Sequence, residues 1–560
     1  MGVEGLLLAH GVVDAGVAGV VDAGVDGVAG SRSTALARTA EGADVVPKTV
    51  SSVPVASLHG PLGSPQRAPL PDARLLGLLD TWLPAQRWYP VKGLTVHHVP
   101  WLSFALTDRC ALHLLRVVGE GVDLVIQVPL VLTPAGRLAA SGEPASPDAG
   151  SGAGSPARTP LPGLVGFVPG PPARPGDPLD APLAVHDGAT HPDLWAAVLG
   201  ALEPAEGAGA GVPCEHPDLT GARAVGGEQS NSSVILPGVA GGSILKILRT
   251  VAIGQHPDVV VPDALARVGW TGVPRPLGWV EASWDAVDVP GRPAGTGSGP
   301  GSASGQTAAT ARTAHLAILS ELVTDAQDGF ELACAYASQD RSFADLAADL
   351  GATLASMHGA LRAALPTGPP LEAGWLLGDL RRRAREACAG SAPLARRAPL
   401  VEAFLDQVAE RLARDDAPPP LLQAIHGDMH LGQALHARGD GWKILDFEGE
   451  PLRPVSERTR PDLPLRDVAG IVRSLDYAAA VGGARSPRWT TTARTAFVEG
   501  YRRAVGEDDG TAGLSVATTE ALLRALVLDK ALYEVVYESR NRPAWEPIPL
   551  TAVDRLLGGR

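Results

Sequence analysis

Cysteine is scarce in this chain of 560 residues, which contains only four: Cys110, Cys214, Cys334 and Cys388. They lie far apart and form no C-x-x-C pair, so they offer no cysteine-based metal site. Isolated cysteines of this kind fit free thiols in a reducing compartment, and we expect a cytoplasmic protein.

Long apolar runs and basic clusters are also lacking. No stretch approaches the ~18 apolar residues that a membrane-spanning helix needs, so we expect no membrane partner. The Gly-, Val- and Ala-rich residues 1–30 carry no Lys or Arg, which argues against a secretory signal. The net charge is −14, and we expect no nucleic-acid partner because such partners attract basic surfaces. The densest basic cluster, residues 381–383, is typical of a solvated helix face.

Glycine and proline are abundant instead, at 66 and 50 residues, and they gather in stretches that read as linkers. The length predicts several domains. We therefore divide the chain into a disordered low-complexity extension at 1–72, a first folded unit at 73–207 with a flexible linker at 134–162, a second unit at 208–325 with a flexible insertion at 291–313, and a helical remainder at 326–560.

Apolar periodicity predicts the main elements. We expect strands at 96–106, 111–118, 122–132, 234–236, 243–248 and 315–323. We expect helices at 75–83, 193–202, 343–361, 400–412, from 466 onward and at 522–541. The first unit is thus a small α+β body, and the last is mainly α-helical.

The most informative pattern is a polar set between two apolar runs. Asp428 and Gln433 follow residues 421–425, and Asp446 follows residues 442–445. We expect strand, loop and strand, with the polar groups at one end of a hairpin. Kinase-type phosphoryl transfer needs a carboxylate for the hydroxyl proton, and an amide and a second carboxylate for Mg²⁺. We predict Asp428 as catalytic residue and Gln433 and Asp446 as metal ligands, against the alternative of solvated or capping side chains.

Lys246 is the only lysine between Lys92 and Lys443, and it sits in the apolar strand 243–248. A lysine buried there needs an anionic partner, and nucleotide phosphates would supply one. The alternative is an edge-strand lysine facing solvent. The preceding loop, 226–233, is rich in small residues whose N–H groups can point at phosphates, although alone it also fits a surface hairpin.

The spacing of Asp428, Gln433 and Asp446 resembles the aminoglycoside-phosphotransferase and choline-kinase branch of the protein-kinase-like fold, and most of all the maltokinases. Gln433 stands where protein kinases carry Asn, and Glu448 where they carry Gly. The resemblance implies an α+β, bilobal fold with a small N-terminal cap domain and a mainly helical C-terminal lobe. Trp82, followed by Arg87 and Trp88, resembles the opening of the maltokinase cap.

The resemblance also implies ATP and Mg²⁺ as cofactors. The expected nucleotide contacts are Lys246, the loop residues Gly227, Gln229, Ser230, Asn231 and Ser232, and the hinge residues Glu321 and Val323. Maltokinases carry an acidic residue that pairs with the strand lysine, but Val260 occupies the expected place here. Asp258 or Asp263 could substitute, and the sequence leaves both open. Asp467 either supports the catalytic loop by hydrogen bonds or is a favourable N-terminal helix charge.

The C-terminal helix at 522–541 carries Lys530, Tyr533, Glu534 and Tyr537 on one face, because their spacings are helical. Aromatic surfaces and charged groups suit a sugar, but the same face also fits a Lys–Glu pair and two tyrosines covering the core. The run 529–538 closely resembles the C-terminal signature of maltokinases, which implies substrate contact. By the same resemblance we expect substrate contacts from His430, Glu448 and Arg473.

The predicted activity is therefore that of a maltokinase, which transfers phosphate from ATP to the anomeric hydroxyl of maltose and feeds α-glucan synthesis. The implied partners are maltose and a trehalose-to-maltose isomerase (trehalose synthase). One alternative is an aminoglycoside or amino-alcohol phosphotransferase of the same fold, although Lys530 suits a neutral sugar better than a cation. The other is a nucleotide-binding pseudokinase, which would be expected to lack Asp428, Asp446 or Lys246.

Overall fold

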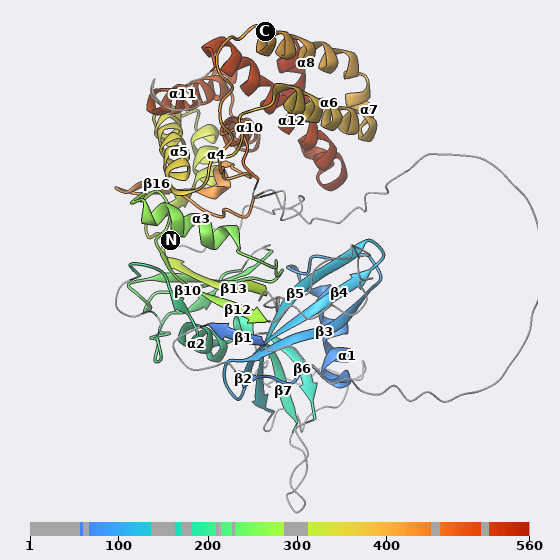
Figure 1. Cartoon of the computed structure of the whole chain (residues 1–560), viewed down its shortest axis with the longest axis vertical. Helices are drawn as coiled ribbons and strands as arrows, with labels where there is room; N and C mark the ends of the chain where they lie inside the picture. The colour runs from blue at the N-terminus through green and yellow to red at the C-terminus, as the bar shows by residue number, and fades with distance from the viewer. Residues whose placement is uncertain are drawn as a thin grey trace, which may run out of the picture.

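The structure is a computed structural model that describes residues 56–59, 66–135, 163–169, 182–208, 212, 214–226, 230–284, 312–449, 458, 460–505 and 514–558. The helices from α4 onward gather at one end of the molecule, and the two larger sheets lie at the other with α1 and α2 beside them (Figure 1). This arrangement confirms the predicted α+β fold with a sheet-rich part and a helical C-terminal lobe.

The cap is built on an antiparallel sheet in the order β2-β3-β4-β5-β7-β6. Its strands and helices are β2 (Gln66–Arg67), α1 (Ala73–Trp82), β3 (Val96–Ala105), β4 (Cys110–Gly119), β5 (Val122–Pro134), β6 (Leu164–Val168), β7 (Leu183–Asp187) and α2 (Pro192–Gly200), with short 3₁₀ turns η2 (Leu83–Ala85) and η4 (Gly188–Thr190). Helix α1 begins where the Asp72 side chain accepts hydrogen bonds from two backbone N–H groups of its first turn, which is the usual N-cap arrangement. The three strands and two helices predicted for this unit are confirmed.

The small lobe is a second antiparallel sheet in the order β1-β12-β13-β11-β10-β9, with β8 paired to β12. Its elements are β1 (Ala56–His59), β8 (Glu203–Pro204), β9 (Arg223–Ala224), β10 (Ser232–Leu236), β11 (Ser243–Ile247), α3 (Pro257–Arg267), β12 (Pro276–Trp284) and β13 (Arg312–Glu321). Strands β10, β11 and β13 lie at the places that the sequence predicted.

Two predicted boundaries need correction. Strands β1 and β2 lie inside the predicted extension 1–72 and pair with β12 and β3, so that extension is not wholly without structure. Strand β13 begins at Arg312, two residues inside the expected insertion 291–313. Most of that insertion and of the linker 134–162 lies outside the described residues.

The cap has a hydrophobic cluster of its own and shares a second one with the small lobe. Phe104 and Leu112 of the cap sheet pack in the same buried cluster as Leu245 of β11 and Leu316 of β13. A backbone bridge between Ile126 and Thr250 also joins the two sheets. The predicted division at residues 207 and 208 therefore cuts through a shared core, and β8 on its N-terminal side already belongs to the small-lobe sheet.

The helical lobe surrounds the hairpin that carries the polar set. Its elements are β14 (Ala326–Asp328), α4 (Gly329–Ser338), α5 (Ala344–Ala364), α6 (Ala373–Gly390), α7 (Ala392–Ala395), α8 (Ala398–Ala413), η5 (Leu431–Gln433), β15 (Ala434–Ala437), β16 (Gly441–Ile444), α10 (Leu465–Val481), α11 (Pro487–Val505), α12 (Val516–Asn541), η6 (Pro543–Trp545) and α13 (Pro547–Leu557). Strands β14, β15 and β16 form a small sheet. The fully buried Ile444 of this hairpin packs in the same core as Phe497 of α11 and Leu522 of α12, which fixes the hairpin against the helices.

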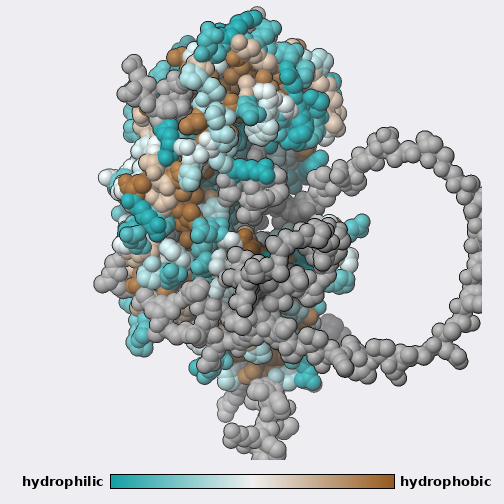
Figure 2. All heavy atoms as spheres, in the orientation of Figure 1, coloured by the Kyte–Doolittle hydropathy of each residue, from teal (hydrophilic) through white to brown (hydrophobic). Residues whose placement is uncertain are grey.

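Among the helices that the structure describes, none is long and apolar enough to cross a bilayer. On the face shown in Figure 2, hydrophilic and hydrophobic residues are interspersed over both lobes.

Candidate active site

The predicted catalytic loop is the segment 426–433. It lies between β15 and the apolar run at 421–425, which forms isolated bridges rather than the expected strand. Asp467, buried near the start of α10, accepts hydrogen bonds from the backbone N–H groups of His426 at 2.8 Å and Gly427 at 2.9 Å. Gly427 adopts a φ of 84°, a conformation that side-chain-bearing residues rarely take. The loop that presents Asp428 is thus held by its backbone, and Asp467 has the supporting role that the sequence left open.

One face of α10 is shaped to receive this loop. A Cβ atom on Gly470 would lie 2.0 Å from the carbonyl oxygen of Met429, so only glycine allows the close approach. One helical turn further on, the Ser474 hydroxyl accepts a hydrogen bond from the Leu431 N–H at 3.1 Å. The spacing from Asp467 to Gly470 and Ser474 follows one helix face, and this pattern is a signal that sequence reasoning missed.

His358 also supports the loop from behind. It lies in helix α5 and is buried there at 2% exposure. Its two ring nitrogens lie 3.0 Å from Asp467 and 2.9 Å from the Tyr501 hydroxyl. Burial would raise the pKa of Asp467, but the hydrogen bond from His358 and the loop contacts lower it below its usual value. Asp467 is therefore held as a carboxylate.

Gln433 and Asp446 lie side by side across the hairpin. The Gln433 amide donates to Asp446 Oδ2 at 3.0 Å, and the Leu445 N–H donates to the Gln433 carbonyl at 2.8 Å. Asp446 has a φ of 62°, which turns the chain sharply at the end of the apolar run. The structure thus brings together the two residues that the sequence predicted as metal ligands.

Lys246 of β11 reaches across to this hairpin. Its Nζ lies 2.8 Å from Asp258, 2.8 Å from Asp446 and 2.7 Å from Glu448. Asp258 stands in the first turn of α3, and its other oxygen accepts from the Phe447 N–H at 3.0 Å. Asp258 is therefore the acidic partner of the strand lysine, whereas Asp263 pairs with Arg267.

The charges in this cluster do not balance, because the single ammonium of Lys246 contacts three carboxylates. Burial would lower the pKa of Lys246, but the carboxylates reverse this and raise it well above its ordinary value. Burial would likewise raise the pKa of Asp446, but Lys246 lowers it to about 2. At Glu448 burial prevails over Lys246, and its pKa is raised. The cluster thus carries an excess of negative charge that suits a divalent cation, since hard carboxylate oxygens are its preferred ligands.

The oxygens of Asp258, Asp446 and Glu448 lie within 4.8 Å of one another. Glu448 also accepts from the Asn231 side chain at 2.8 Å. These contacts place Glu448 beside Lys246 and Asn231, whereas the sequence had predicted that Glu448 contacts the substrate.

The predicted nucleotide loop is described at Gly226 and from Ser230 onward, and Gly227 and Gln229 lie outside the described residues. Ser230 is exposed, while Asn231 and Ser232 are half-buried at the start of β10. Strand β13 ends at Glu321, which is exposed beside Arg275, and Val323 follows it. The structure does not test the predicted hinge contacts.

The predicted sugar face lies next to Asp428. Lys530 of α12 contacts Asp428 Oδ1 at 3.2 Å, which brings the catalytic loop and the C-terminal helix together. Tyr533 and Tyr537 stack with ring centroids 6.3 Å apart. His430, the remaining loop residue of the prediction, is half-buried and caps η5 through its ring nitrogen.

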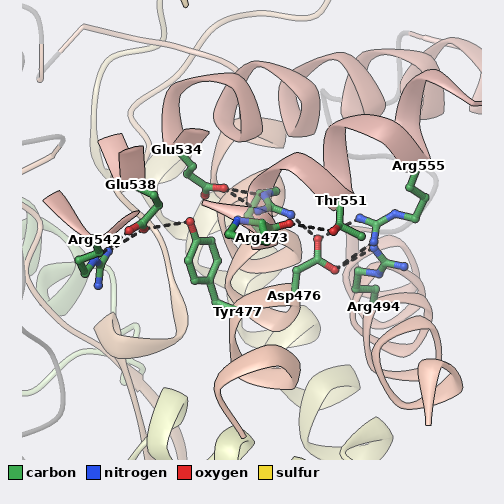
Figure 3. A network of polar contacts seen from close by, with 10 residues as sticks. Arg473, Asp476, Tyr477, Arg494, Glu534, Glu538, Arg542, Thr551 and Arg555 are labelled. Atoms are coloured by element: carbon green, nitrogen blue, oxygen red, sulfur yellow. Dashed lines mark hydrogen bonds and ion pairs between the residues drawn. The ribbon is translucent and has the colours of Figure 1, made fainter. Parts of the chain in front are cut away.

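Figure 3 shows the polar network behind that face. Arg473 of α10 contacts Glu534 at 2.7 Å and also pairs with Asp476. Arg473 is 1% exposed, so it has no surface for the direct sugar contact that the sequence predicted. Its guanidinium instead fixes Glu534, whose pKa is raised by burial even though Arg473 opposes the shift.

The network extends outward to the last helices. Asp476 is also contacted by Arg494 of α11 at 3.0 Å and by Arg555 of α13 at 2.9 Å. Nearby, the Tyr477 hydroxyl donates to Glu538 of α12 at 3.0 Å. These contacts connect four helices, and they could not be read from the sequence because the partners are 18 to 79 positions apart.

Known proteins resemble this chain over much of its length. A model of the phosphotransferase enzyme family (APH) matches residues 333–515. A glucosamine kinase of Mycolicibacterium smegmatis is 30% identical over 356 residues, which are 60% of this chain and 80% of that protein. A glucosamine kinase of Streptacidiphilus jiangxiensis is 28% identical over 365 residues, 61% of this chain and 75% of that protein.

A solved glucosamine kinase in complex with glucosamine, ADP and inorganic phosphate is also similar in fold, with a TM-score of 0.54 and 21% identity. The match covers 85% of this chain and 98% of that structure, including the sheet-rich part as well as the helical lobe. The family match falls on the segment that holds Asp428, Gln433 and Asp446. With four fifths of a 30% identical relative aligned to it, the chain belongs to the phosphotransferase enzyme family.

Proposed function

We propose that this protein is an ATP-dependent sugar kinase. The observation that carries the proposal is the convergence of two groups on the catalytic hairpin. Asp428 contacts Lys530 of α12, and Asp467 holds the backbone of the two residues before it. Asp446, on the same hairpin, contacts Lys246 of the small lobe. A hydroxyl acceptor and a nucleotide phosphate can thus approach one hairpin from two sides, as phosphoryl transfer requires.

The proposed nucleotide side is formed by Lys246, the loop 230–232 and the acidic cluster. Lys246 would neutralise the phosphates that are not transferred. Asp446 and Gln433 would hold Mg²⁺, with Glu448 close enough to add an oxygen. The fit rests on the donor set, because carboxylate and amide oxygens are hard ligands. When bound, the ion would offset charge on the phosphates.

The proposed role of Asp428 is to orient the acceptor hydroxyl and to take its proton as the oxygen bonds to the γ-phosphorus and the bond to the β-phosphate oxygen breaks. Lys530, 3.2 Å away, keeps a positive charge beside this carboxylate. Glu534 receives both Arg473 contacts on Oε2, so its Oε1 can accept from the acceptor. Catalysis would then rest mainly on alignment and charge stabilisation.

Glucosamine is the first candidate acceptor. Two relatives at 28–30% identity carry the name glucosamine kinase, and the identity spans most of their lengths. The face beside Asp428 offers Glu534 for a cationic amino group and the stacked Tyr533–Tyr537 pair for the ring. An amino sugar therefore finds both an anion and an aromatic surface.

Maltose is the second candidate, with phosphorylation of its anomeric hydroxyl to maltose 1-phosphate. The run 529–538 of α12 favours it, because it resembles the C-terminal signature of maltokinases. Lys530 also suits a neutral sugar better than a cation. In that case a trehalose-to-maltose isomerase would supply the substrate. For either acceptor we propose a cytoplasmic location, where ATP is available and the four free cysteines stay reduced.

The test is release of ADP from Mg·ATP in the presence of glucosamine, N-acetylglucosamine, glucose, maltose, trehalose or kanamycin. Glucosamine as the best acceptor, with N-acetylglucosamine inactive, would support the amino-sugar assignment. Maltose as the best acceptor would replace it with the second candidate, and kanamycin would indicate an aminoglycoside phosphotransferase. ATP binding without turnover of any acceptor would support a pseudokinase and contradict the proposal.

A further inference from the structure

Arg249, two residues beyond β11, is a fully buried cation at the junction of the cap and the small lobe. Its exposure is 1%. Its Nη2 atom donates to both oxygens of Asp187, at 2.9 and 2.7 Å, and Asp187 ends strand β7 of the cap. The guanidinium also lies 4.2 Å from the ring centre of Trp88. The cap thus supplies both the acidic partner and an aromatic wall for this cation.

Arg249 also donates hydrogen bonds to two residues of the proposed nucleotide loop. Arg249 Nε donates to the Ser232 hydroxyl at 2.8 Å, and the Arg249 backbone N–H donates to the Asn231 side chain at 3.1 Å. Asn231 in turn donates to Glu448 at 2.8 Å. A continuous path of contacts therefore runs from Asp187 of the cap to the acidic cluster around Lys246.

This arrangement demands a partner because a guanidinium stays protonated at all physiological pH values. A buried charge left without its partner is costly, and the charge-assisted hydrogen bonds from Nη2 to the two oxygens of Asp187 hold that end of the guanidinium. With Nη2 fixed on Asp187, the direction of Nε toward Ser232 is set as well. The backbone is fixed too, because Gln127 of β5 donates to the Arg249 carbonyl at 2.7 Å.

We propose that Arg249 is a positioning residue through which Asp187 and Trp88 of the cap pre-order residues 231 and 232 for the nucleotide. The inference rests on the proposed function, since it takes this loop as the nucleotide loop. It assigns the cap a part in nucleotide affinity, although the cap residues that it names do not touch the acidic cluster.

Weakening the ion pair between Arg249 and Asp187 should make residues 231 and 232 less ordered before the nucleotide binds. Nucleotide binding would then have to order the loop, and the KM for ATP should rise about tenfold, the factor that 1.4 kcal/mol produces. The KM for the sugar should stay within about twofold, because α12 and the catalytic loop are unchanged. A purely structural role would instead lower the melting temperature and the amount of active enzyme, with both KM values unaltered.

The experiment compares the full-length wild type with Asp187→Asn, which keeps the side-chain shape and removes the charge. Asp187→Glu keeps the charge, moves the carboxylate by one methylene and serves where the first variant fails to fold. The matched control is Asp123→Asn, which removes the carboxylate of an exposed cap ion pair with Arg116. Calorimetry of Mg·ATP binding and steady-state kinetics are measured on each protein.

A selective rise in the ATP KM and the Mg·ATP Kd for the Asp187 variant, absent in Asp123→Asn, supports the inference. Unchanged ATP values, or equal changes for ATP and sugar, overturn it. A wild type that binds no Mg·ATP would be a failure of the proposed function itself. The two failures are therefore distinguishable.

Discussion

Replacement of Asp467 by Asn should slow turnover by weakening the support of the catalytic loop. The carboxylate accepts from two backbone N–H groups, at 2.8 Å from His426 and 2.9 Å from Gly427, and contacts His358 at 3.0 Å. Asparagine has only one acceptor oxygen, so its amide must face one of these donors. The buried N–H group left without an acceptor costs about 1–3 kcal/mol.

The effect on rate follows from how much of that cost falls on the alignment of Asp428. If the transition state bears 1–3 kcal/mol of it, kcat falls by roughly 5- to 150-fold. The KM for ATP should change by less than about threefold, because Lys246 and the loop 230–232 do not contact Asp467, and we take KM here as a measure of ground-state binding. Steady-state kinetics with both substrates and urea unfolding measure these quantities.

The control is Asp529→Asn, which removes another buried carboxylate of the helical lobe. Asp529 contacts Arg383 and Arg466 rather than the catalytic loop. Both variants should lose stability, but only Asp467→Asn should lose kcat. If the two variants lost stability alike and kept wild-type kcat, the positioning role of Asp467 would be refuted.

Three further predictions address the metal, the acceptor and pH. Asp446→Ala should abolish Mg²⁺-dependent ATP affinity, and unchanged Mg·ATP binding by calorimetry would exclude Asp446 as a ligand. Tyr537→Ala should raise the acceptor KM more than the ATP KM; a lower melting temperature with an unchanged acceptor KM would leave the tyrosine as packing. Because the folded-state pKa of Asp467 is lowered, its stabilising contribution is present above the unfolded pKa of about 3.9 and lost as pH falls through the folded value. The unfolding free energy should therefore drop more steeply below about pH 4 in the wild type than in Asp467→Asn, and equal slopes would contradict this.

Local pattern was sufficient for the polar set and for part of the elements, but β12, α6 and α11 were not predicted. Apolar alternation and helical spacing gave strands β3 to β5 and helices α5, α8 and α12 within a few residues. The order of Asp428, Gln433 and Asp446 predicted a hairpin with its polar groups at one end, and these groups do lie at one end of a hairpin. Its first strand is β15, after Gln433, whereas the apolar run 421–425 that was expected as the first strand forms only isolated bridges.

Contacts between distant segments were not accessible in the same way. The sequence left Asp258 and Asp263 open, because both lie on α3 and only the fold decides which one faces Lys246. The family resemblance implied that Arg473 contacts the substrate, but α10 turns it inward to Asp476 and Glu534. The ion pair between Arg249 and Asp187, 62 positions away, likewise forms only when the two sheets pack together.

The central claim is that Asp428 acts on an acceptor hydroxyl in a kinase site, and one comparison tests it most directly. The rate of ADP release from Mg·ATP with the best acceptor is measured for the wild type and for Asp428→Asn, after equal Mg·ATP binding has been established for both. Loss of proton acceptance and alignment should reduce turnover by two or more orders of magnitude, with nucleotide affinity retained. Turnover within about tenfold of the wild type would contradict the assignment of Asp428.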